Sequence, residues 1–312
     1  MVPDAHSFEK WLRLRPGFEH ARVLDVVPLD GGVSNITCRA DLAEAPFGAV
    51  ALRVQRERGI FEPYDVVREG EVLRRLEPSA VPVPNLIASE PSSDVLGAPF
   101  IVLEWIDAPH MGNAPDANYS EFLAAVAAIH RLDWRALGLD ILGVPASPRD
   151  ALLAEIAAIE WRRMRFDGAD EPLLVTARDL LKASAPGDGR LALCQGDINI
   201  FNYLFRDGKV VAVVDWEQAR ISDPRSDVGH MMALGVLKGA PFGPADGQPF
   251  VQAYGAIAGS PVHGMAWFRA RWLWELGVIY YGWRQFSGSE PWYTHVQWTA
   301  ALEAGLDELS HG

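Results

Sequence analysis

The chain has 312 residues, of which 49% are hydrophobic and 22% are charged, a composition typical of a folded globular protein and not of a disordered one. Its 41 acidic residues outnumber its 28 basic ones and give a net charge of −13, which argues against a nucleic-acid partner and against an anionic membrane, because both require a basic face. Since the sequence has no apolar run of transmembrane length, no secretory signal at its start and only two cysteines, Cys38 and Cys194, we expect a cytoplasmic protein without a disulfide framework.

The pattern of the first hundred residues predicts several strands and one helix. β-Branched residues and rough alternation predict the strands, and a Gly-rich turn at 30–35 separates the first two. Asp65 is a candidate N-cap for the helix. The predicted strands lie within 21–29, 36–42, 49–55, 81–91 and 98–108, and the helix spans 65–77.

Beyond about residue 107 the pattern becomes helical. Strong helices are expected at 121–132 and 149–166, and the last sixty residues are helical and rich in tryptophan. A short β-like region, 193–220, lies between them. The change of style predicts a β-rich lobe and a larger helical lobe that join near Glu104–Ala108, where a ligand-binding cleft is expected.

Two charged residues of the first lobe are expected to pair. Arg53 alternates with apolar residues on what resembles a central strand, although an edge strand with a solvated arginine is the alternative. Glu69 lies on the apolar stripe of helix 65–77, and a carboxylate on a buried stripe needs a partner. Arg53 is the obvious partner, and a helix glutamate that holds a strand cation is the device that positions the nucleotide in protein kinases.

Three polar residues interrupt or end the β-like region. Asp197 and Asn202 form the pattern D-x-x-x-x-N within "LCQGDINIFNYLF", and Asp215 ends the next apolar run. Each residue alone is an ordinary turn residue. Together they supply what phosphoryl transfer needs, namely a carboxylate that receives the hydroxyl proton and oxygen ligands for Mg²⁺. The Gly-rich turn could cradle phosphate, or it could be a simple hairpin turn.

The series "DGGVSN", Arg53, Glu69, "LEWID", "AAIHRLD", "QGDINIFN" and "VVDWEQARISDPRSDVGH" resembles, in order and over nearly the whole chain, the aminoglycoside phosphotransferase and choline kinase-like family. Looser features resemble the branch of that family associated with acyl-CoA dehydrogenases. The resemblance implies an α+β fold similar to protein kinases and two lobes, a nucleotide-binding lobe at 1–106 and a helical catalytic and substrate-binding lobe at 107–312.

The resemblance also implies a role for each site residue. Asp197 corresponds to the catalytic base, and Asn202 and Asp215 correspond to the Mg²⁺ ligands. Asp227 would brace the catalytic loop, with His130 as a core histidine tied into that loop. The residues expected to bind ATP are Gly32, Ser34, Asn35, Arg53, Glu69 and the backbone of Glu104 and Ile106.

The chain departs from the family pattern at two positions. Arg53 stands where many members have lysine, which keeps the charge but changes its geometry. Gln195 stands where the family has histidine, and its amide can replace the hydrogen bonds of an imidazole but cannot titrate. We therefore expect an intact loop.

The expected function is Mg²⁺- and ATP-dependent phosphorylation of a hydroxyl group on a small molecule. An aminoglycoside, a choline-like cation and a hydroxyacyl compound all remain open as acceptors. The alternative is a non-catalytic nucleotide-binding module, which only Gln195 and Arg53 favour. The C-terminal aromatic residues could line the acceptor pocket, but the spacing of Trp267, Trp274 and Tyr281 at sevens favours a packed core.

Overall fold

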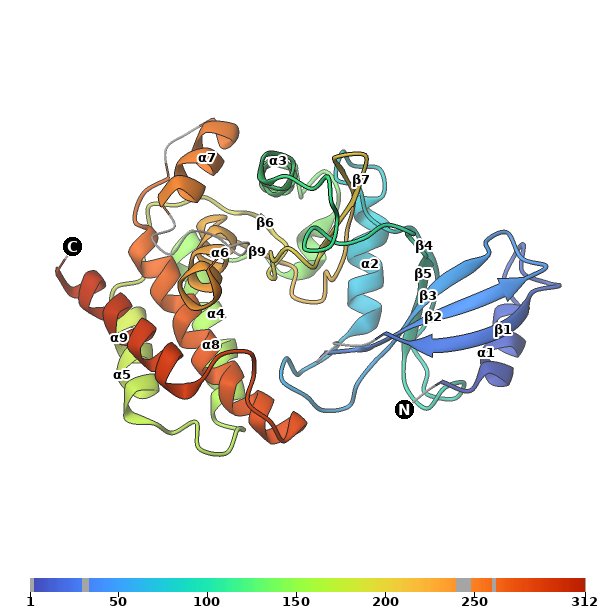
Figure 1. Ribbon diagram of the computed structural model, residues 1–312, viewed down its shortest axis with the longest axis horizontal. Helices are drawn as coiled ribbons and strands as arrows, with labels where there is room; N and C mark the ends of the chain where they lie inside the picture. Colours follow the sequence, from blue (N-terminus) through green and yellow to red (C-terminus); the bar gives the residue numbers. More distant parts are fainter. Residues whose placement is uncertain (1–2, 30–33, 240–247, 260–261, 312) are drawn as a thin grey trace. The chain divides into compact units, whose positions relative to one another are not determined.

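The computed structural model describes residues 3–29, 34–239, 248–259 and 262–311. The chain forms two compact units (Figure 1). The first unit is Met1–Ala108 with Ala212–Glu217, and the second is Pro109–Val211 with Gln218–Gly312. The division predicted between residues 106 and 107 does not include this return of the chain to the first unit. Of the helices that the structure describes, none combines the length and the apolar character that crossing a membrane would need.

The first unit is built on a five-stranded antiparallel sheet with the order β1-β2-β3-β5-β4. Strand β3 lies at its centre, where Arg53 is opposite Thr37 of β2 and Ile101 of β5. The edge-strand alternative for Arg53 is therefore wrong. The strands are β1 (Arg22–Pro28), β2 (Ile36–Ala43), β3 (Ala49–Val54), β4 (Leu86–Glu90) and β5 (Phe100–Glu104).

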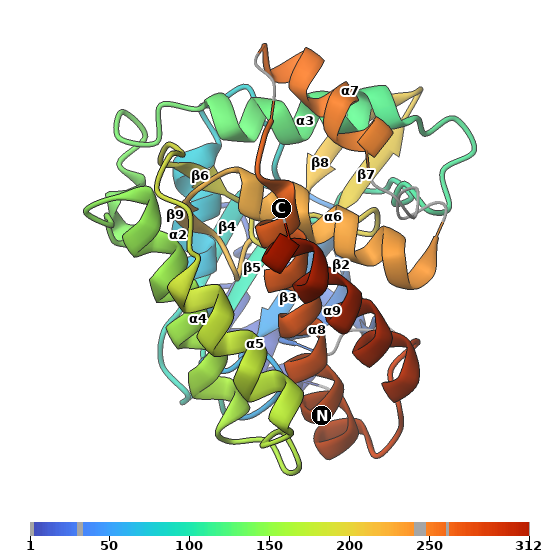
Figure 2. The ribbon, with the colours of Figure 1, turned by 90° about the vertical axis from the view of Figure 1, so that its left-hand side faces the viewer.

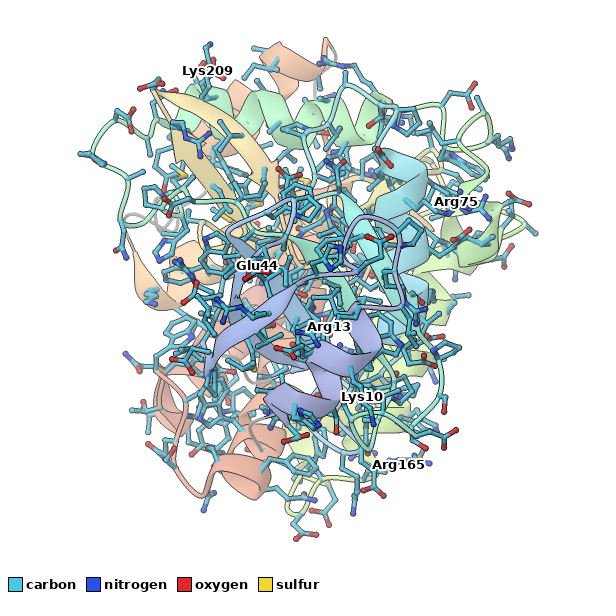
Figure 3. All side chains as sticks on the ribbon, turned by 90° about the vertical axis from the view of Figure 1, so that its right-hand side faces the viewer. Lys10, Arg13, Glu44, Arg75, Arg165 and Lys209 are labelled. Atoms are coloured by element: carbon cyan, nitrogen blue, oxygen red, sulfur yellow. The ribbon has the colours of Figure 1, made fainter. Side chains whose placement is uncertain are left out.

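Helix α1 (Ala5–Leu12) covers one face of this sheet. Its Phe8, Trp11 and Leu12 are buried with the alternate residues of β2, β3 and β5 that point to this face. Lys10 and Arg13 lie on the solvent side of the helix (Figure 3). Burial of three large apolar side chains fixes α1 on the sheet.

Helix α2 (Val66–Leu76) packs against β4 and β5. Asp65 caps it by accepting a hydrogen bond from the Arg68 N–H at 2.9 Å, as predicted. A Cβ atom at Gly70 would lie only 3.0 Å from a methyl carbon of Ile101, so glycine allows the helix to come close to β5. Because strand residues alternate, Arg53 and Ile101 point to the face opposite α1.

The predicted fourth strand begins later than expected. The prediction started at Val81, whereas β4 spans only Leu86–Glu90. Pro82 and Pro84 cannot donate ladder hydrogen bonds, so this stretch stays outside the sheet. The Pro82 carbonyl instead accepts a hydrogen bond from the Val213 N–H at 2.8 Å.

The second unit is mainly helical, and Figure 2 shows α4, α5, α8 and α9 packed side by side. Two short strand pairs, β6 with β9 and β7 with β8, carry the loops of the candidate site. The helices are α3 (Tyr119–Arg131), η1 (Leu139–Leu142), α4 (Pro148–Arg163), α5 (Pro172–Ala183), α6 (Arg225–Lys238), α7 (Gln248–Ala258), α8 (Met265–Ser287) and α9 (His295–His311). The strands are β6 (Ala192–Cys194), β7 (Tyr203–Arg206), β8 (Lys209–Val213), whose last two residues belong to the first unit, and β9 (Arg220–Ser222). The predicted α+β class is confirmed.

Most C-terminal aromatic side chains belong to the core, as their sevenfold spacing indicates. Trp267, Trp274 and Tyr281 are buried along α8. The indole N–H groups of Trp267 and Trp274 donate to backbone carbonyls of α5 at 3.1 and 3.0 Å, so their polar atoms are satisfied inside the core. Trp292 is different, because 44% of its surface is exposed.

A network of buried charges links α4, α8 and β9 within the second unit. Glu275 binds Arg162 at 2.6 Å and Arg271 at 2.8 Å. Arg271 also binds Glu155 at 2.8 Å, and Glu155 binds Arg220 at 3.1 Å. A buried ion needs such a partner, so each removal leaves an uncompensated charge.

Replacement of Glu275 tests the contribution of this network to stability. Burial alone would raise the pKa of Glu275, but Arg271 and Arg162 outweigh it and lower this pKa from 4.5 to about 2. Because the pKa is lower in the folded state, the stabilisation is present above about pH 4.5 and is lost as the pH falls toward about 2. Glu275→Gln should lower the free energy of unfolding at pH 7 by about 3–5 kcal/mol and flatten its acid dependence, as measured by urea unfolding.

The matched control is Glu303→Gln, which removes an exposed carboxylate of α9. This change should alter the free energy of unfolding by less than about 0.5 kcal/mol. Equal losses in the two variants would show that the buried network contributes nothing specific.

Candidate functional site

The predicted pair of Arg53 and Glu69 forms within the first unit. The Arg53 Nε lies 3.0 Å from Glu69 Oε2, and both side chains are buried. Strand β3 presents Arg53 on the face that α2 covers, and Glu69 lies on the buried stripe of α2. The prediction of an ion pair between strand and helix is therefore confirmed.

The return segment Ala212–Glu217 brings two further carboxylates to Arg53. The Arg53 Nη2 lies 3.1 Å from Asp215 Oδ1 and 3.3 Å from Glu217 Oε2. The Trp216 N–H donates to Glu69 Oε1 at 3.3 Å, which fixes the segment between these carboxylates. Asp215 has a φ of 62°, in the left-handed region that few residues other than glycine adopt. Such a conformation at a non-glycine residue is typical of functional sites.

Negative charge is in excess around Arg53. Burial raises the pKa of Glu69 to about 7, although Arg53 acts against this shift. Burial and the nearby Asp215 carboxylate raise the pKa of Glu217 as well. Burial opposes the charge of Arg53, but the three carboxylates outweigh it and raise the pKa of Arg53. A divalent cation would offset the excess charge, and carboxylate oxygens are the donors that Mg²⁺ prefers, so these residues fit a Mg²⁺ ion.

The Gly-rich turn is described only in part. Gly32 lies outside the described residues, whereas Ser34 and Asn35 are buried. The Asn35 amide donates to Glu217 Oε2 at 2.9 Å, and its oxygen accepts from the Arg56 N–H at 3.2 Å. Asn35 thus ties the turn to the acidic cluster, and its contact with phosphate stays a prediction.

The segment that ends the first unit follows β5. The Glu104 side chain accepts from Asn85 at 2.8 Å, and its N–H donates to the Asn85 carbonyl at 2.9 Å. The Ile106 carbonyl accepts from the Ala108 N–H at 3.0 Å. The expected contact of these two backbones with adenine stays a prediction.

The loop between β6 and β7 in the second unit brings Asp197 and Asn202 together. The Asn202 amide donates to the Asp197 carbonyl at 2.8 Å and to Asp197 Oδ2 at 3.0 Å. Asn199 donates to Asp197 Oδ1 at 3.0 Å. These bonds fix the Asp197 carboxylate, which keeps 26% of its side-chain surface exposed. The amide oxygen of Asn202 is then the atom that could bind a metal.

Asp227 of α6 binds the start of this loop, as expected for a bracing residue. It is fully buried and accepts from the N–H groups of Gln195 at 2.9 Å and Gly196 at 3.1 Å. His130 Nε2 lies 3.1 Å from the same carboxylate, and its Nδ1 lies 2.7 Å from the Tyr254 hydroxyl. Because an ionised carboxylate only accepts, Nε2 of His130 donates to Asp227.

Gln195 and Gly196 precede Asp197 where the loop leaves β6. Gly196 has a φ of 91°, and a Cβ atom there would lie 2.3 Å from the Gln218 carbonyl oxygen, so only glycine fits. Gln195 is fully buried. That its side chain replaces the bonds of a histidine stays a prediction.

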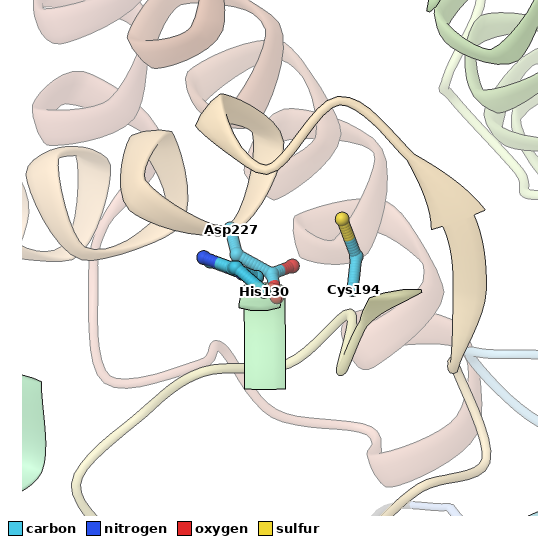
Figure 4. A group of neighbouring side chains, drawn as sticks. All are labelled: His130, Cys194 and Asp227. Atoms are coloured by element: carbon cyan, nitrogen blue, oxygen red, sulfur yellow. Dashed lines mark hydrogen bonds and ion pairs between the residues drawn. The ribbon is translucent and has the colours of Figure 1, made fainter. Parts of the chain in front are cut away.

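Cys194 joins His130 and Asp227 in a buried group with three possible metal-ligand atoms within 4.8 Å of one another (Figure 4). Both His130 nitrogens and both Asp227 oxygens already take part in hydrogen bonds. Burial raises the pKa of the Cys194 thiol well above its ordinary value, and the thiol donates to the Asp223 carbonyl at 3.5 Å. The group is a hydrogen-bonded brace.

Two residues that lie at the site, His230 and Glu217, were not predicted from the sequence. His230 Nδ1 lies 3.6 Å from Asp197 Oδ1, and its ring stacks on Trp272 with centroids 3.8 Å apart. Burial lowers the pKa of His230 to about 3, so the ring beside Asp197 is neutral. Its position one helical turn after Asp227 is a signal that could have identified it. Glu217 lies within the stretch "VVDWEQARISDPRSDVGH", and its bond to Arg53 depends on the tertiary structure.

Comparisons with known proteins find relatives by sequence and solved structures that share the fold. The chain is 25% identical to acyl-CoA dehydrogenase family member 10 of Mus musculus over 74% of its length, and 27% identical to member 11 of Gallus gallus over 73%. It covers only 22% and 30% of those proteins, so it spans less than a third of the length of these relatives. A structure of a thermostable mutant of the aminoglycoside phosphotransferase APH(4)-Ia, with ADP and hygromycin B, shares the fold with a TM-score of 0.66, at 18% identity over 98% of this chain and 99% of that one.

The family comparison covers most of the sequence. The model of the phosphotransferase enzyme family, APH, matches residues 25–273, which include every candidate site residue named above. The kinase-like α+β fold expected from the sequence is confirmed. This chain belongs to the phosphotransferase enzyme family APH.

Proposed function

We propose that this chain transfers the γ-phosphoryl group of ATP to a hydroxyl group of a small molecule. The carrying observation is the loop at Asp197, where a partly exposed carboxylate is fixed by Asn199 and Asn202 and braced by Asp227. This is the arrangement that a base for a hydroxyl group requires, with geometry set before the substrate binds. The family match supports the reaction class, and ADP in the APH(4)-Ia structure supports ATP as the donor.

In this proposal Asp197 accepts the proton of the acceptor hydroxyl. The hydroxyl oxygen forms its bond to the γ-phosphorus while the bond from that phosphorus to the β-phosphate oxygen breaks, and ADP leaves. His230 stays neutral beside Asp197, so it adds no positive charge that would weaken the base. Asn199 and Asn202 keep the carboxylate in one orientation.

The remaining roles follow the same proposal. Asn202 and Asp215 would hold Mg²⁺, which supplies positive charge to the phosphate oxygens when it is bound. Arg53, positioned by Glu69, would contact the phosphates. The other residues proposed to bind ATP are Gly32, Ser34, Asn35 and the backbone groups of Glu104 and Ile106.

Replacement of the base separates catalysis from nucleotide binding. Asp197→Ala should lower the transfer rate by about a hundredfold to ten-thousandfold, because no other group of the loop can accept the proton. The Kd for Mg-ATP should stay within about threefold, because the change leaves Arg53, Glu69 and Asp215 intact. ATP consumption with aminoglycosides, choline, sugars, macrolides and hydroxyacyl thioesters measures the first quantity, and calorimetry measures the second.

Asp307→Ala is the control, since it removes an exposed carboxylate of α9. It should leave both quantities unchanged. Transfer by Asp197→Ala at the wild-type rate would refute the assigned base. If wild-type protein bound Mg-ATP but phosphorylated none of these acceptors, the non-catalytic alternative would replace the proposal.

The departure at position 195 gives a second prediction. Gln195→His should change the transfer rate by less than about threefold, because an imidazole offers similar hydrogen-bonding atoms and the backbone N–H to Asp227 is retained. Steady-state kinetics with the best acceptor of the panel measures the effect. A change above about tenfold in either direction would show that the side chain at this position tunes the reaction.

A further inference from the structure

One face of α6 follows the catalytic loop. Asp227, His230, Leu234 and Lys238 are spaced by three, four and four residues, so their side chains share a face of the helix. Asp227 binds the start of the loop, and His230 lies beside Asp197. The Lys238 ammonium lies 5.5 Å from the ring centroid of Phe201, at the other end of the same loop.

Lys238 also lies over a second exposed aromatic ring. Its ammonium is 4.7 Å from the ring centroid of Trp292. Phe201 and Trp292 are 45% and 44% exposed, whereas the other Phe and Trp residues in the described part of the second unit are buried or partly buried. His110 packs edge-on against Phe201 with centroids 4.9 Å apart, which helps to fix that ring. One cation and two exposed rings thus converge beside the loop of the base.

We propose that Lys238, Phe201 and Trp292 form an acceptor subsite that binds an anionic group, a carboxylate or a phosphate, on the hydroxyl compound to be phosphorylated. This inference rests on the proposed function and specifies its acceptor class. The ammonium supplies a charge-assisted hydrogen bond to the anion, and the exposed rings provide apolar contacts for the part of the acceptor next to it. Partial burial already lowers the pKa of Lys238, a cost that a bound anion would offset.

The same arrangement disfavours a polycationic acceptor. An aminoglycoside would bring ammonium groups next to Lys238, and like charges at short range repel. The ring faces that could otherwise bind such a cation are already occupied by the lysine. The structure therefore favours an anionic acceptor over an aminosugar or a choline-like cation.

Matched acceptors test the subsite by kinetics. The probes are ω-hydroxyoctanoate, its methyl ester and ω-hydroxyoctyl phosphate, with the aminoglycoside hygromycin B as the cationic comparison. Lys238→Ala should raise the KM for the carboxylate or the phosphate about tenfold with little change in kcat, and should leave the KM for the ester unchanged. Lys238→Arg should retain part of the affinity, because it keeps the charge. Lys182→Ala, which removes an exposed lysine of α5, is the control and should have no effect.

Lysine acetylation tests the subsite without catalysis. The chain has only four lysines, Lys10, Lys182, Lys209 and Lys238, so mass spectrometry can follow each one. In Asp197→Ala protein with Mg-ADP present, the carboxylate or the phosphate should slow acetylation of Lys238 about fivefold or more, and the ester should not. Acetylation of the other three lysines should not change.

The two experiments distinguish the failure of this inference from failure of the proposed function. If anionic probes protect Lys238 but no acceptor is phosphorylated, the subsite stands and the proposed function falls. If the probes leave acetylation of Lys238 unchanged, or if Lys238→Ala retains the wild-type KM for both anionic acceptors, the subsite is refuted. Better use of hygromycin B than of either anion, with no dependence on Lys238, would refute it as well.

Discussion

The buried carboxylate of Asp227 is the constraint on which the candidate site depends. One side chain accepts hydrogen bonds from two consecutive backbone N–H groups and from His130, so it fixes where the loop leaves β6. Desolvation would penalise this charge, but its hydrogen bonds and the cationic groups near it lower its pKa, so it stays ionised. Since Asp197 follows Gly196 directly, the position of the proposed base is set by a residue thirty positions later in the chain. A carboxylate that is already fixed accepts the proton of a hydroxyl group more readily than a mobile one, because the side chain does not have to be reoriented first.

The balance between buried acidic and basic side chains differs between the two units. In the second unit, Glu155 and Glu275 are surrounded by Arg162, Arg220 and Arg271, so the acids are fully compensated and the network ties helices together. In the first unit, one arginine faces three carboxylates; burial raises the pKa values of Glu69 and Glu217, and the nearby Asp215 carboxylate adds to both shifts. Uncompensated acid in a folded protein is costly unless a cation joins it, and this difference separates a structural network from a candidate metal site.

The aromatic residues near the C-terminus divide in a similar way. Those on α8 are buried and donate their polar atoms to backbone carbonyls, so they stabilise the helical unit and are not available to a ligand. Trp292 and Phe201 remain at the surface, and both face Lys238. A protein with a net charge of −13 thus places a lysine beside the loop of its proposed base. If the proposed subsite binds the acceptor, local charge and not the overall balance would determine which acceptors are favoured.

The sequence by itself determined the α+β class, most of the elements and the pairing of Arg53 with Glu69. These follow from periodicity and from the cost of burying an unpaired polar group, both of which are local or nearly so. The bracing roles of Asp227 and His130 were implied by the resemblance to a known family. Only the tertiary structure decided which groups from distant segments meet. The attachment of Ala212–Glu217 to the first unit, the bond from Glu217 to Arg53, the place of His230 beside Asp197 and the convergence of Lys238, Phe201 and Trp292 all depend on packing between elements far apart in the chain. Periodicity does not encode such contacts, because it indicates which face of an element is buried and not which distant element covers that face.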